Sequence, residues 1–213
     1  MKARCWILVV VLACFSHLAA GVEYWPMPVD RVYHYANADG ATLTVTWQSV
    51  ADGEVESHCV YELGGGIYQI ISDRFIRNAQ GNLCIRSCSY LTDGSLEPAT
   101  ASYVPALGFL ILPPFVGDEW GSAGRVTQAS VSSLYYHICS VVREETVTVP
   151  YGTFETLVVV QQDTFGPTLH TGTYYLNREI GPVLLPGGFE LVSIGGAVAA
   201  AEETWGSVKA QFR

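Results

Sequence analysis

Alternation of apolar and polar residues is the feature that most constrains how this chain folds. Residues 42–48 place Leu43, Val45 and Trp47 on one side of an extended strand, and threonines and a glutamine on the other. Residues 55–63 repeat the pattern, with valine, serine, cysteine, tyrosine and leucine at every second position. A period of two residues is that of a β-strand with one buried and one solvated face. The pattern predicts antiparallel strands.

Further strands are predicted along the chain, separated by turns at Asp39-Gly40, Gly64–Gly66 and Asn78–Asn82. Residues 157–160 are apolar at every position, which is typical of a strand buried on both faces. Strands without intervening helices predict one all-β domain over residues 21–203. We expect a single curled antiparallel sheet that forms a sandwich or a partly open barrel. The other predicted strands span residues 67–77, 83–91, 134–150 (as one strand or two), 174–178, 181–185 and 189–194.

Three segments lack this alternation. Residues 92–107 contain Pro98 and Pro105 and are predicted to form a surface loop. The following apolar stretch is predicted to be an edge strand or a loop that covers the core. The alternative interpretation is an apolar lip over a ligand pocket, formed by Phe109, Leu110, Ile111, Leu112 and Phe115.

The third segment, residues 204–213, is predicted to be a short amphipathic helix. Thr204 is a suitable N-cap residue, and Trp205, Val208 and Phe212 fall on one stripe at helical spacing. We expect this helix to pack on the sheet. The alternative is a sorting or docking tail.

The first twenty residues have the pattern of an export signal. Lys2 and Arg4 precede an apolar run over residues 6–13, and Ala19 and Ala20 offer a small-residue cleavage site. The run is too short to span a bilayer, and no later apolar run reaches transmembrane length. An alternative processing site ends in Cys14, which would then carry a lipid anchor. The sequence therefore predicts an exported protein, periplasmic or extracellular.

The charge of the chain excludes one class of partner. The formal net charge is −9, and removal of the leader leaves 9 basic against 20 acidic side chains, or −11. Such a surface repels phosphate backbones, so nucleic-acid binding is not expected. Anionic membrane surfaces are disfavoured for the same reason.

Four cysteines follow the leader, and in an oxidising compartment an even number predicts disulfides. On one extended strand, residues four apart lie about 13 Å from each other, which is too far for a direct bond between the two cysteines of residues 84–88. Two cysteines on strands that flank a third strand, about 10 Å apart, are also too far. The pairing therefore stays open. The four cysteines are Cys59, Cys84, Cys88 and Cys139.

A zinc site is the rival interpretation of these cysteines. Cys84 and Cys88, together with His58-Cys59 and a His137-x-Cys139 pair, supply thiolates and imidazoles, which zinc prefers. Neighbouring residues on a strand point to opposite faces, so His58 and Cys59 would not share a metal, whereas His137 and Cys139 would. We predict no metal and no cofactor.

No pattern of residues indicates nucleophilic catalysis. The chain lacks a Gly-x-Ser-x-Gly elbow, a His-Glu-x-x-His motif and a phosphate-binding glycine loop. Glycosidases use two carboxylic acids across a sugar, and adjacent acids occur at residues 118–119, 144–145 and 202–203. Neighbouring acids on a strand point apart, so these are interpreted as solvated positions. We predict no catalytic residues.

Several short motifs resemble bacterial envelope proteins of unknown function, close to the domain family called DUF3108. The most similar segment is residues 147–156, in which Pro150, Gly152, Thr153 and Phe154 form a Pro-x-Gly-Thr-Phe motif. Residues 24–26 with 30–33, 117–120, 174–176 and 181–183 are also similar. The chain departs from the segment with which the family's domain begins. Asp30 replaces the usual Gly-polar pair there, and Val32 replaces the usual tryptophan. The motifs are spread over residues 24–194.

The Pro-x-Gly-Thr-Phe motif is interpreted as a hairpin. Pro150 fixes φ, Gly152 takes an unusual backbone conformation, and Phe154 returns to the core. The resemblance implies a curled antiparallel sheet, similar to the open barrel of lipoprotein carriers, and it implies no activity.

These observations leave two main hypotheses for function. The first is a non-catalytic exported protein that binds an apolar small molecule in a curved sheet. The second is a structural or protein-interaction module at the cell surface, with an envelope protein as its partner. A glycan hydrolase is a remote alternative.

Overall fold

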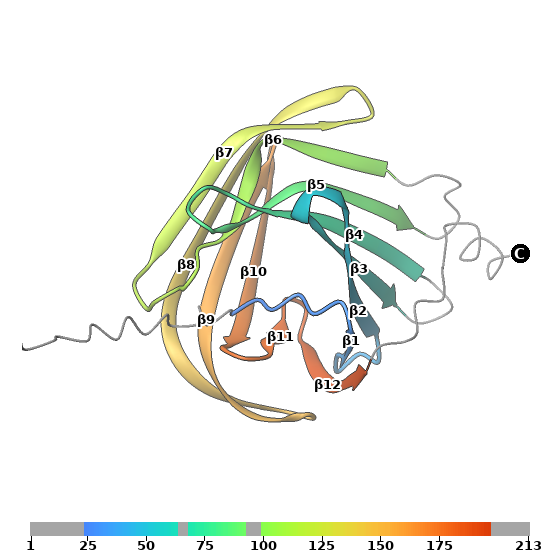
Figure 1. The fold of residues 1–213 in the computed structure, drawn as a ribbon, viewed down its shortest axis with the longest axis vertical. Helices are drawn as coiled ribbons and strands as arrows, with labels where there is room; N and C mark the ends of the chain where they lie inside the picture. The colour runs from blue at the N-terminus through green and yellow to red at the C-terminus, as the bar shows by residue number, and fades with distance from the viewer. Residues whose placement is uncertain (1–23, 64–67, 93–98, 197–213) are drawn as a thin grey trace, which may run out of the picture.

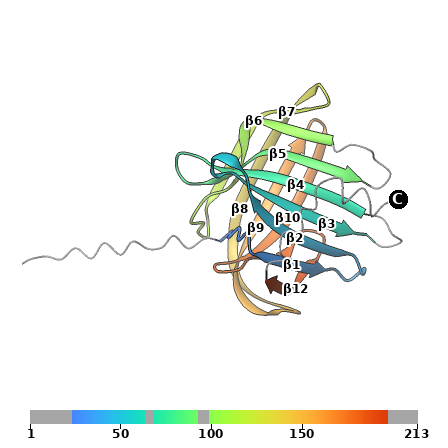
Figure 2. The ribbon, with the colours of Figure 1, turned by 45° about the vertical axis from the view of Figure 1, so that its right-hand side comes forward.

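The chain forms a closed barrel of twelve antiparallel strands in a computed structural model that describes residues 24–63, 68–92 and 99–196. Each strand pairs with its neighbours in sequence, and β1 pairs with β12 to close the ring (Figures 1 and 2). A 3-10 turn, η1 (Ala51–Gly53), joins β2 to β3. The strands are β1 (Arg31–Ala36), β2 (Thr42–Ser49), β3 (Val55–Glu62), β4 (Tyr68–Arg77), β5 (Leu83–Thr92), β6 (Ala99–Leu110), β7 (Glu119–Gln128), β8 (Val131–Val149), β9 (Gly152–Phe165), β10 (Thr168–Asn177), β11 (Gly181–Leu185) and β12 (Phe189–Gly196).

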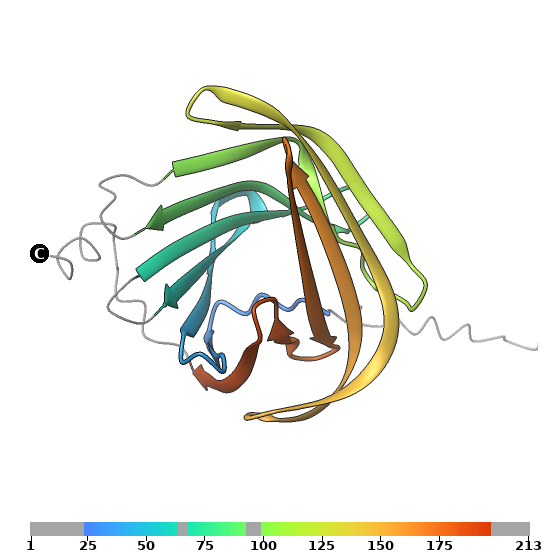
Figure 3. The ribbon, with the colours of Figure 1, turned by 180° about the vertical axis from the view of Figure 1, so that it is seen from behind.

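The prediction of an all-β antiparallel fold is confirmed, and the closed barrel replaces the predicted sandwich or partly open barrel. Strands β2–β5 form one side of the barrel and β7–β10 the opposite side (Figures 1 and 3). The predicted leader with Cys14, and the predicted C-terminal helix with Trp205, Val208 and Phe212, lie outside the described residues. In the described part of the chain, no helix is long and apolar enough to cross a membrane.

The alternation in the sequence sorts side chains between the inside and the outside of the barrel. Leu43, Val45 and Trp47 of β2 are buried and belong to the main core, which fills the barrel interior. Register places them opposite Tyr61, Cys59 and Ser57 of β3. Because side chains alternate across the wall of a barrel, the residues between them face outward.

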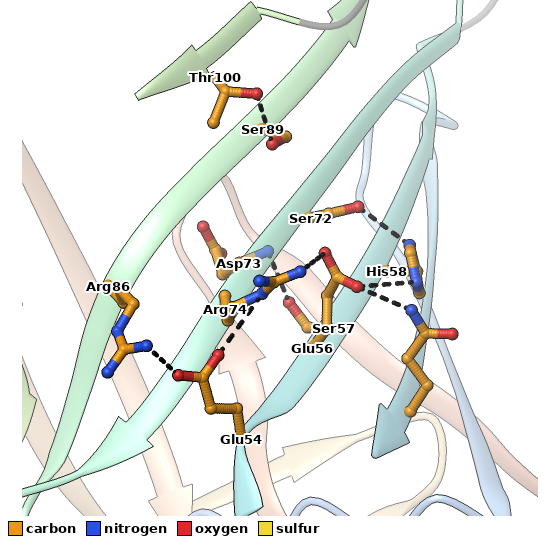
Figure 4. A network of polar contacts seen from close by, with 11 residues as sticks. Glu54, Glu56, Ser57, His58, Ser72, Asp73, Arg74, Arg86, Ser89 and Thr100 are labelled. Carbon is orange, nitrogen blue, oxygen red and sulfur yellow. Dashed lines mark hydrogen bonds and ion pairs between the residues drawn. The ribbon is translucent and has the colours of Figure 1, made fainter. Parts of the chain in front are cut away.

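Charged residues on the outer face of β3–β5 pair with one another. Glu54 forms ion pairs with Arg86 and, at 3.7 Å, with Arg74, which also lies 4.0 Å from Glu56. On the same face, Ser72 Oγ lies 2.9 Å from His58 Nδ1 (Figure 4). The arginines of this side of the barrel are therefore engaged on the outside of the wall.

Strand β6 corrects the predicted loop at residues 92–107, because residues 99–110 are a strand. Proline has no backbone N–H, and Pro105 lies at a position where β6 is paired with neither β5 nor β7. The register with β5 jumps from Ser102 to Leu107, and pairing with β7 stops at Val104. Proline is tolerated at such interruptions of a ladder, which is why its presence did not exclude a strand.

Beyond Val104, side chains replace the missing ladder between β6 and β7. The Gly108 amide donates to Ser122 Oγ at 3.0 Å, and the Trp120 indole donates to the Phe109 carbonyl at 3.2 Å. The Tyr135 hydroxyl of β8 donates to the Pro105 carbonyl at 2.7 Å. We call this region, between residues 105–110 and 119–124, the β6–β7 seam.

The apolar stretch after residue 108 divides between several environments. Phe109 lies in the barrel interior, Leu110 is buried in the core and Leu112 packs against the core. Phe115, by contrast, is 63% exposed. The barrel is closed, so the stretch is not an edge strand, and its five residues do not form a continuous lip.

The hairpin between β8 and β9 has the two-residue turn Pro150-Tyr151, with Val149 paired to Gly152. Phe154 packs against the core, and its ring stacks on Tyr151. Gly152 corrects the prediction of an unusual backbone, because its φ is outside the left-handed region. The turn is completed before Gly152, so this residue already belongs to the ladder.

Candidate functional site

The barrel interior contains a cavity of about 200 Å³, which is the candidate functional site. Its wall combines residues of β1–β4, β6, β10 and β11 with Trp25 and Pro26 of the segment that precedes β1. That segment crosses the barrel near β11 (Figure 1). Most of the lining is aromatic or aliphatic, and Ser57, Cys59 and Asp73 provide its polar side chains together with the tyrosines.

Aromatic rings from four separate parts of the chain meet on this wall. The ring of Phe109 lies 4.7 Å from Trp25, 5.5 Å from Phe75 and 6.3 Å from Tyr174 between centroids, all in edge-to-face arrangements. Phe75 in turn lies 5.7 Å from Trp47. Such contacts give the rings fixed positions, so the cavity is a preformed one.

Asp73 is the carboxylate of this wall. Strand β4 places it opposite Ser57 of β3 and Cys88 of β5, and its backbone N–H donates to Ser57 Oγ at 3.3 Å. Its side chain faces the cavity instead of bulk water, and this burial raises the pKa of Asp73 to about 6, an increase that a hydrogen bond from the Cys88 thiol partly opposes. Burial favours the neutral acid because the interior solvates charge poorly.

No cationic side chain compensates Asp73 among the described residues. The neighbouring Arg74 points to the outer network (Figure 4), and no lysine, arginine or histidine lines the described cavity. Burial raises the pKa of Cys59 to about 12 and raises the pKa of Tyr61 and Tyr174 as well. The groups around Asp73 are therefore neutral at physiological pH.

Two residues of the lining carry a polar group without a hydrogen-bond partner in the described chain. They are Trp25, through its indole N–H, and Tyr33, through its hydroxyl, and both groups are buried. Buried donors are almost always paired in folded proteins, so these two groups are exceptions within the described core.

A second polar cluster lies in the same interior, from β8 and β9. His137 Nδ1 lies 2.5 Å from Asp163 Oδ1, and His137 Nε2 lies 3.2 Å from Cys139 Sγ. Gln161 donates to the other oxygen of Asp163. In the tautomer whose Nδ1–H donates to the carboxylate, Nε2 accepts from the thiol.

The order thiol, imidazole, carboxylate is that of nucleophilic cysteine enzymes, yet the surroundings oppose this chemistry. Cys139 is 2% exposed and His137 1%, and neither lines the cavity. Burial, followed by the charge of Asp163, raises the pKa of Cys139 to about 12. A reactive cysteine requires a thiolate in an accessible place. In this conformation Cys139 is a hydrogen-bond donor inside a packed core.

The sequence contained part of this cluster. His137 and Cys139 were expected to share one strand face, and they do. Asp163 and its role were not found, because its contact with His137 depends on the register between β8 and β9. In the described residues, no three histidine, cysteine or acidic side chains converge to hold a metal ion.

The predicted disulfides are not present, because the four cysteines are free thiols in this structure. Cys59 lies on β3, Cys84 and Cys88 on β5, and Cys139 on β8. Strand β4 separates the first from the second and third, and β6 and β7 separate these from Cys139. Non-adjacent strands are about 10 Å or more apart, beyond the reach of a disulfide.

The two described acid pairs lie away from the cavity. Asp118 accepts a hydrogen bond from the Phe115 amide at 2.8 Å and so stabilises a turn, while Glu119 is exposed. Glu145 pairs with Arg143 on the surface beside exposed Glu144. Glu202 and Glu203 lie outside the described residues.

Comparisons of the chain with protein-family models, with curated protein sequences and with solved structures found no match. The resemblance to DUF3108-like proteins therefore stays a prediction from short motifs.

We predict that Asp73→Asn raises the free energy of unfolding at about pH 7–8 by about 1–3 kcal/mol, since a gap of one pKa unit between folded and unfolded states corresponds to about 1.4 kcal/mol. The pKa of Asp73 is raised from 3.8 to about 6 in the folded state. The contribution of Asp73 to stability is therefore complete below the pKa that it has in the unfolded chain. It is lost as the pH rises through the pKa that it has in the folded protein. Urea unfolding across this pH range measures the effect. Exposed Asp52→Asn is the control, and an unchanged pH profile in the Asp73 variant would contradict the assignment.

We predict that His137→Gln destabilises the barrel by about 3–5 kcal/mol, because it removes the imidazole from a buried carboxylate. Adding Asp163→Asn removes the stranded charge, so the double variant should be more stable than His137→Gln alone. Urea unfolding of the wild type, of His137→Gln, of Asp163→Asn and of the double variant gives the coupling energy. A double variant no more stable than the single one would show that the two side chains do not depend on each other.

Proposed function

We propose that this protein binds a small, largely apolar molecule inside its barrel and carries out no chemistry on it. The observation that carries the proposal is the aromatic cavity of about 200 Å³ in the barrel, with Asp73 on its wall. Ligand sites in proteins combine an apolar lining with a few polar groups that fix orientation, and the mouths of β-barrels are a common place for them.

The size of the cavity limits the ligand. An apolar cavity of roughly 150 Å³ holds a benzene molecule. The cavity described above therefore suits a molecule with one ring and a short chain, and it is too small for a long acyl chain. The cavity volume therefore limits the size of the apolar small molecule that the sequence led us to expect.

The proposed setting is outside the cytoplasm, in the envelope or the extracellular fluid. It is supported by the signal-like pattern of residues 1–20. Binding without catalysis is supported by the neutral, buried state of Cys139 and by the outward position of the described acid pairs.

We predict that Val45→Phe abolishes binding of neutral one-ring probes such as toluene and 2-phenylethanol. Val45 lines the cavity, so the larger side chain occupies the ligand volume. Val192→Phe is the matched control, because Val192 is 40% exposed. Trp47 also lines the cavity, so tryptophan fluorescence and calorimetry can both follow the titration.

The Val45 variant must first show cooperative unfolding, since overpacking a core costs about 1–3 kcal/mol. Native mass spectrometry of protein purified from its own source adds an independent readout of a retained molecule. Wild-type protein that retains nothing and binds no one-ring probe would refute the proposal, and equal binding by the Val45 variant would move the site elsewhere.

A second candidate function, protein interaction, is supported by apolar residues on the outer face of β8. Leu134, Tyr136 and Ile138 are each about half exposed, and Leu169 of β10 is 63% exposed. Register aligns Tyr136 with Leu169 through Thr164 of β9. Contiguous exposed apolar residues are typical of interaction surfaces.

For this second function we predict self-association through the β8 face, measured by sedimentation velocity. We expect the wild-type protein to form a dimer. The double variant Tyr136→Ser, Ile138→Ser should be shifted toward monomer, because the contact loses its apolar centre. Val131→Ser is the control, because Val131 is exposed but lies outside the set formed by Leu134, Tyr136 and Ile138. A wild-type protein that is already monomeric at high concentration would exclude this interface.

A further inference from the structure

We propose that the cavity selects small molecules that carry an ammonium group next to an apolar ring or chain, with Asp73 as the anionic anchor. This inference rests on the proposed binding function and names its ligand class. The juxtaposition that carries it is an uncompensated interior carboxylate surrounded by aromatic rings.

The carboxylate is the first step of the argument. Asp73 lines the cavity, the Cys88 thiol is the one side-chain donor that lowers the pKa of its carboxyl, and it forms no ion pair in the described chain. A thiol is a weak donor, so most of the acceptor capacity of the carboxylate stays unused. An ammonium group supplies three donors and a positive charge to this position.

The aromatic rings are the second step. Tyr61, Trp47 and Phe75 line the same cavity as Asp73, and Tyr174 lines it from the opposite side of the barrel. The charge of Asp73 contributes to raising the pKa of both tyrosines, so their rings are close enough to interact with it electrostatically. Ammonium groups are attracted to the faces of aromatic rings, most strongly where water is excluded.

The absence of positive charge is the third step. No lysine, arginine or histidine lines the described cavity, so an anionic ligand would meet Asp73 without a counter-ion. The chain also carries a formal net charge of −9, which attracts cations toward the protein. A neutral molecule fits the volume but leaves the carboxylate unpaired.

Few other groups titrate near Asp73. Cys59 and Tyr61 face it from β3, Cys88 from β5, Tyr103 from β6 and Tyr174 from β10, and burial raises the pKa of each of them. The other interior carboxylate, Asp163, is paired with His137. Protonation of Asp73, whose pKa is about 6, therefore governs the pH dependence of binding in the acid range.

The test compares 2-phenylethylamine with 2-phenylethanol, which has the same ring and chain length but no charge. Calorimetry at about pH 7.5 is expected to show tighter binding of the amine by wild-type protein. Asp73→Asn should weaken amine binding roughly 10- to 100-fold, as is typical of a lost charge-assisted hydrogen bond, and leave the alcohol nearly unchanged. Asp52→Asn, at an exposed aspartate, should bind both probes as wild type does.

The pH series is the second readout. Amine affinity in wild-type protein should fall about tenfold per pH unit below the pKa of Asp73, because the neutral acid no longer attracts the cation. Asp73→Asn should show no such fall. Asparagine is close in shape to aspartate and is expected to stabilise the fold, so loss of amine binding in this variant will not reflect unfolding.

Three results would overturn the inference. Equal amine binding by wild type and Asp73→Asn would remove Asp73 as the anchor. Tighter binding of the alcohol than of the amine by wild type, with loss of both in Val45→Phe, would refute the ammonium preference and leave the proposed binding function intact. Failure of the wild-type protein to bind either probe would overturn the inference and the proposed function together.

Discussion

Hydrogen bonding between β1 and β12 closes the sheet, and the rest of the structure depends on that closure. Residues 31–36 pair with residues 190–196, so the first and last strands of the described chain have no free edge. In a closed barrel every strand has an inner and an outer face, and alternate residues are committed to one or the other. The interior therefore collects side chains from strands far apart in the sequence, as the meeting of Trp25, Phe75, Phe109 and Tyr174 illustrates.

Where the ladder is interrupted, side chains from the next strand complete the wall. At the β6–β7 seam, the Tyr135 hydroxyl satisfies the Pro105 carbonyl, and the Trp120 indole satisfies the Phe109 carbonyl. Buried carbonyl groups without partners cost roughly 1–3 kcal/mol each, which explains why polar tips from β7 and β8 are used here. The same contacts hold Phe109, and thereby one side of the cavity, in place.

The strands and their inner faces were predictable because the alternation is local. Leu43, Val45 and Trp47 could be assigned to one face from their spacing alone, and the structure buries all three. The closure of the barrel was not predictable, since it depends on pairing between residues about 160 positions apart.

Local irregularities of the strands, and single residues without a motif, explain most of what could not be predicted from the sequence. Cys84 and Cys88, four residues apart, would share one face of a regular strand. A register shift near Arg86 separates them, so that Cys88 is opposite Asp73 and Cys84 is opposite Ile76. Strand β6 was missed because Pro105 suggested a loop. Asp73 was missed because it stands between Ser72 and Arg74, where an acid is typical of a solvated position, and because a single acid forms no motif.

The two interior carboxylates of the described chain differ in whether the protein itself supplies a hydrogen-bonding partner. Asp163 accepts from His137 and from Gln161, so its burial is compensated within the fold. Asp73 has only the Cys88 thiol as a side-chain donor in the described chain, and burial raises its pKa to about 6. Unpaired buried charge lowers stability, so a fold that keeps it has either a partner outside the chain or a use for the proton. The aromatic cavity beside Asp73 has room for such a partner, whereas the packed surroundings of Asp163 do not, and this is why the ligand site is assigned to β4 and not to the Cys139–His137–Asp163 cluster.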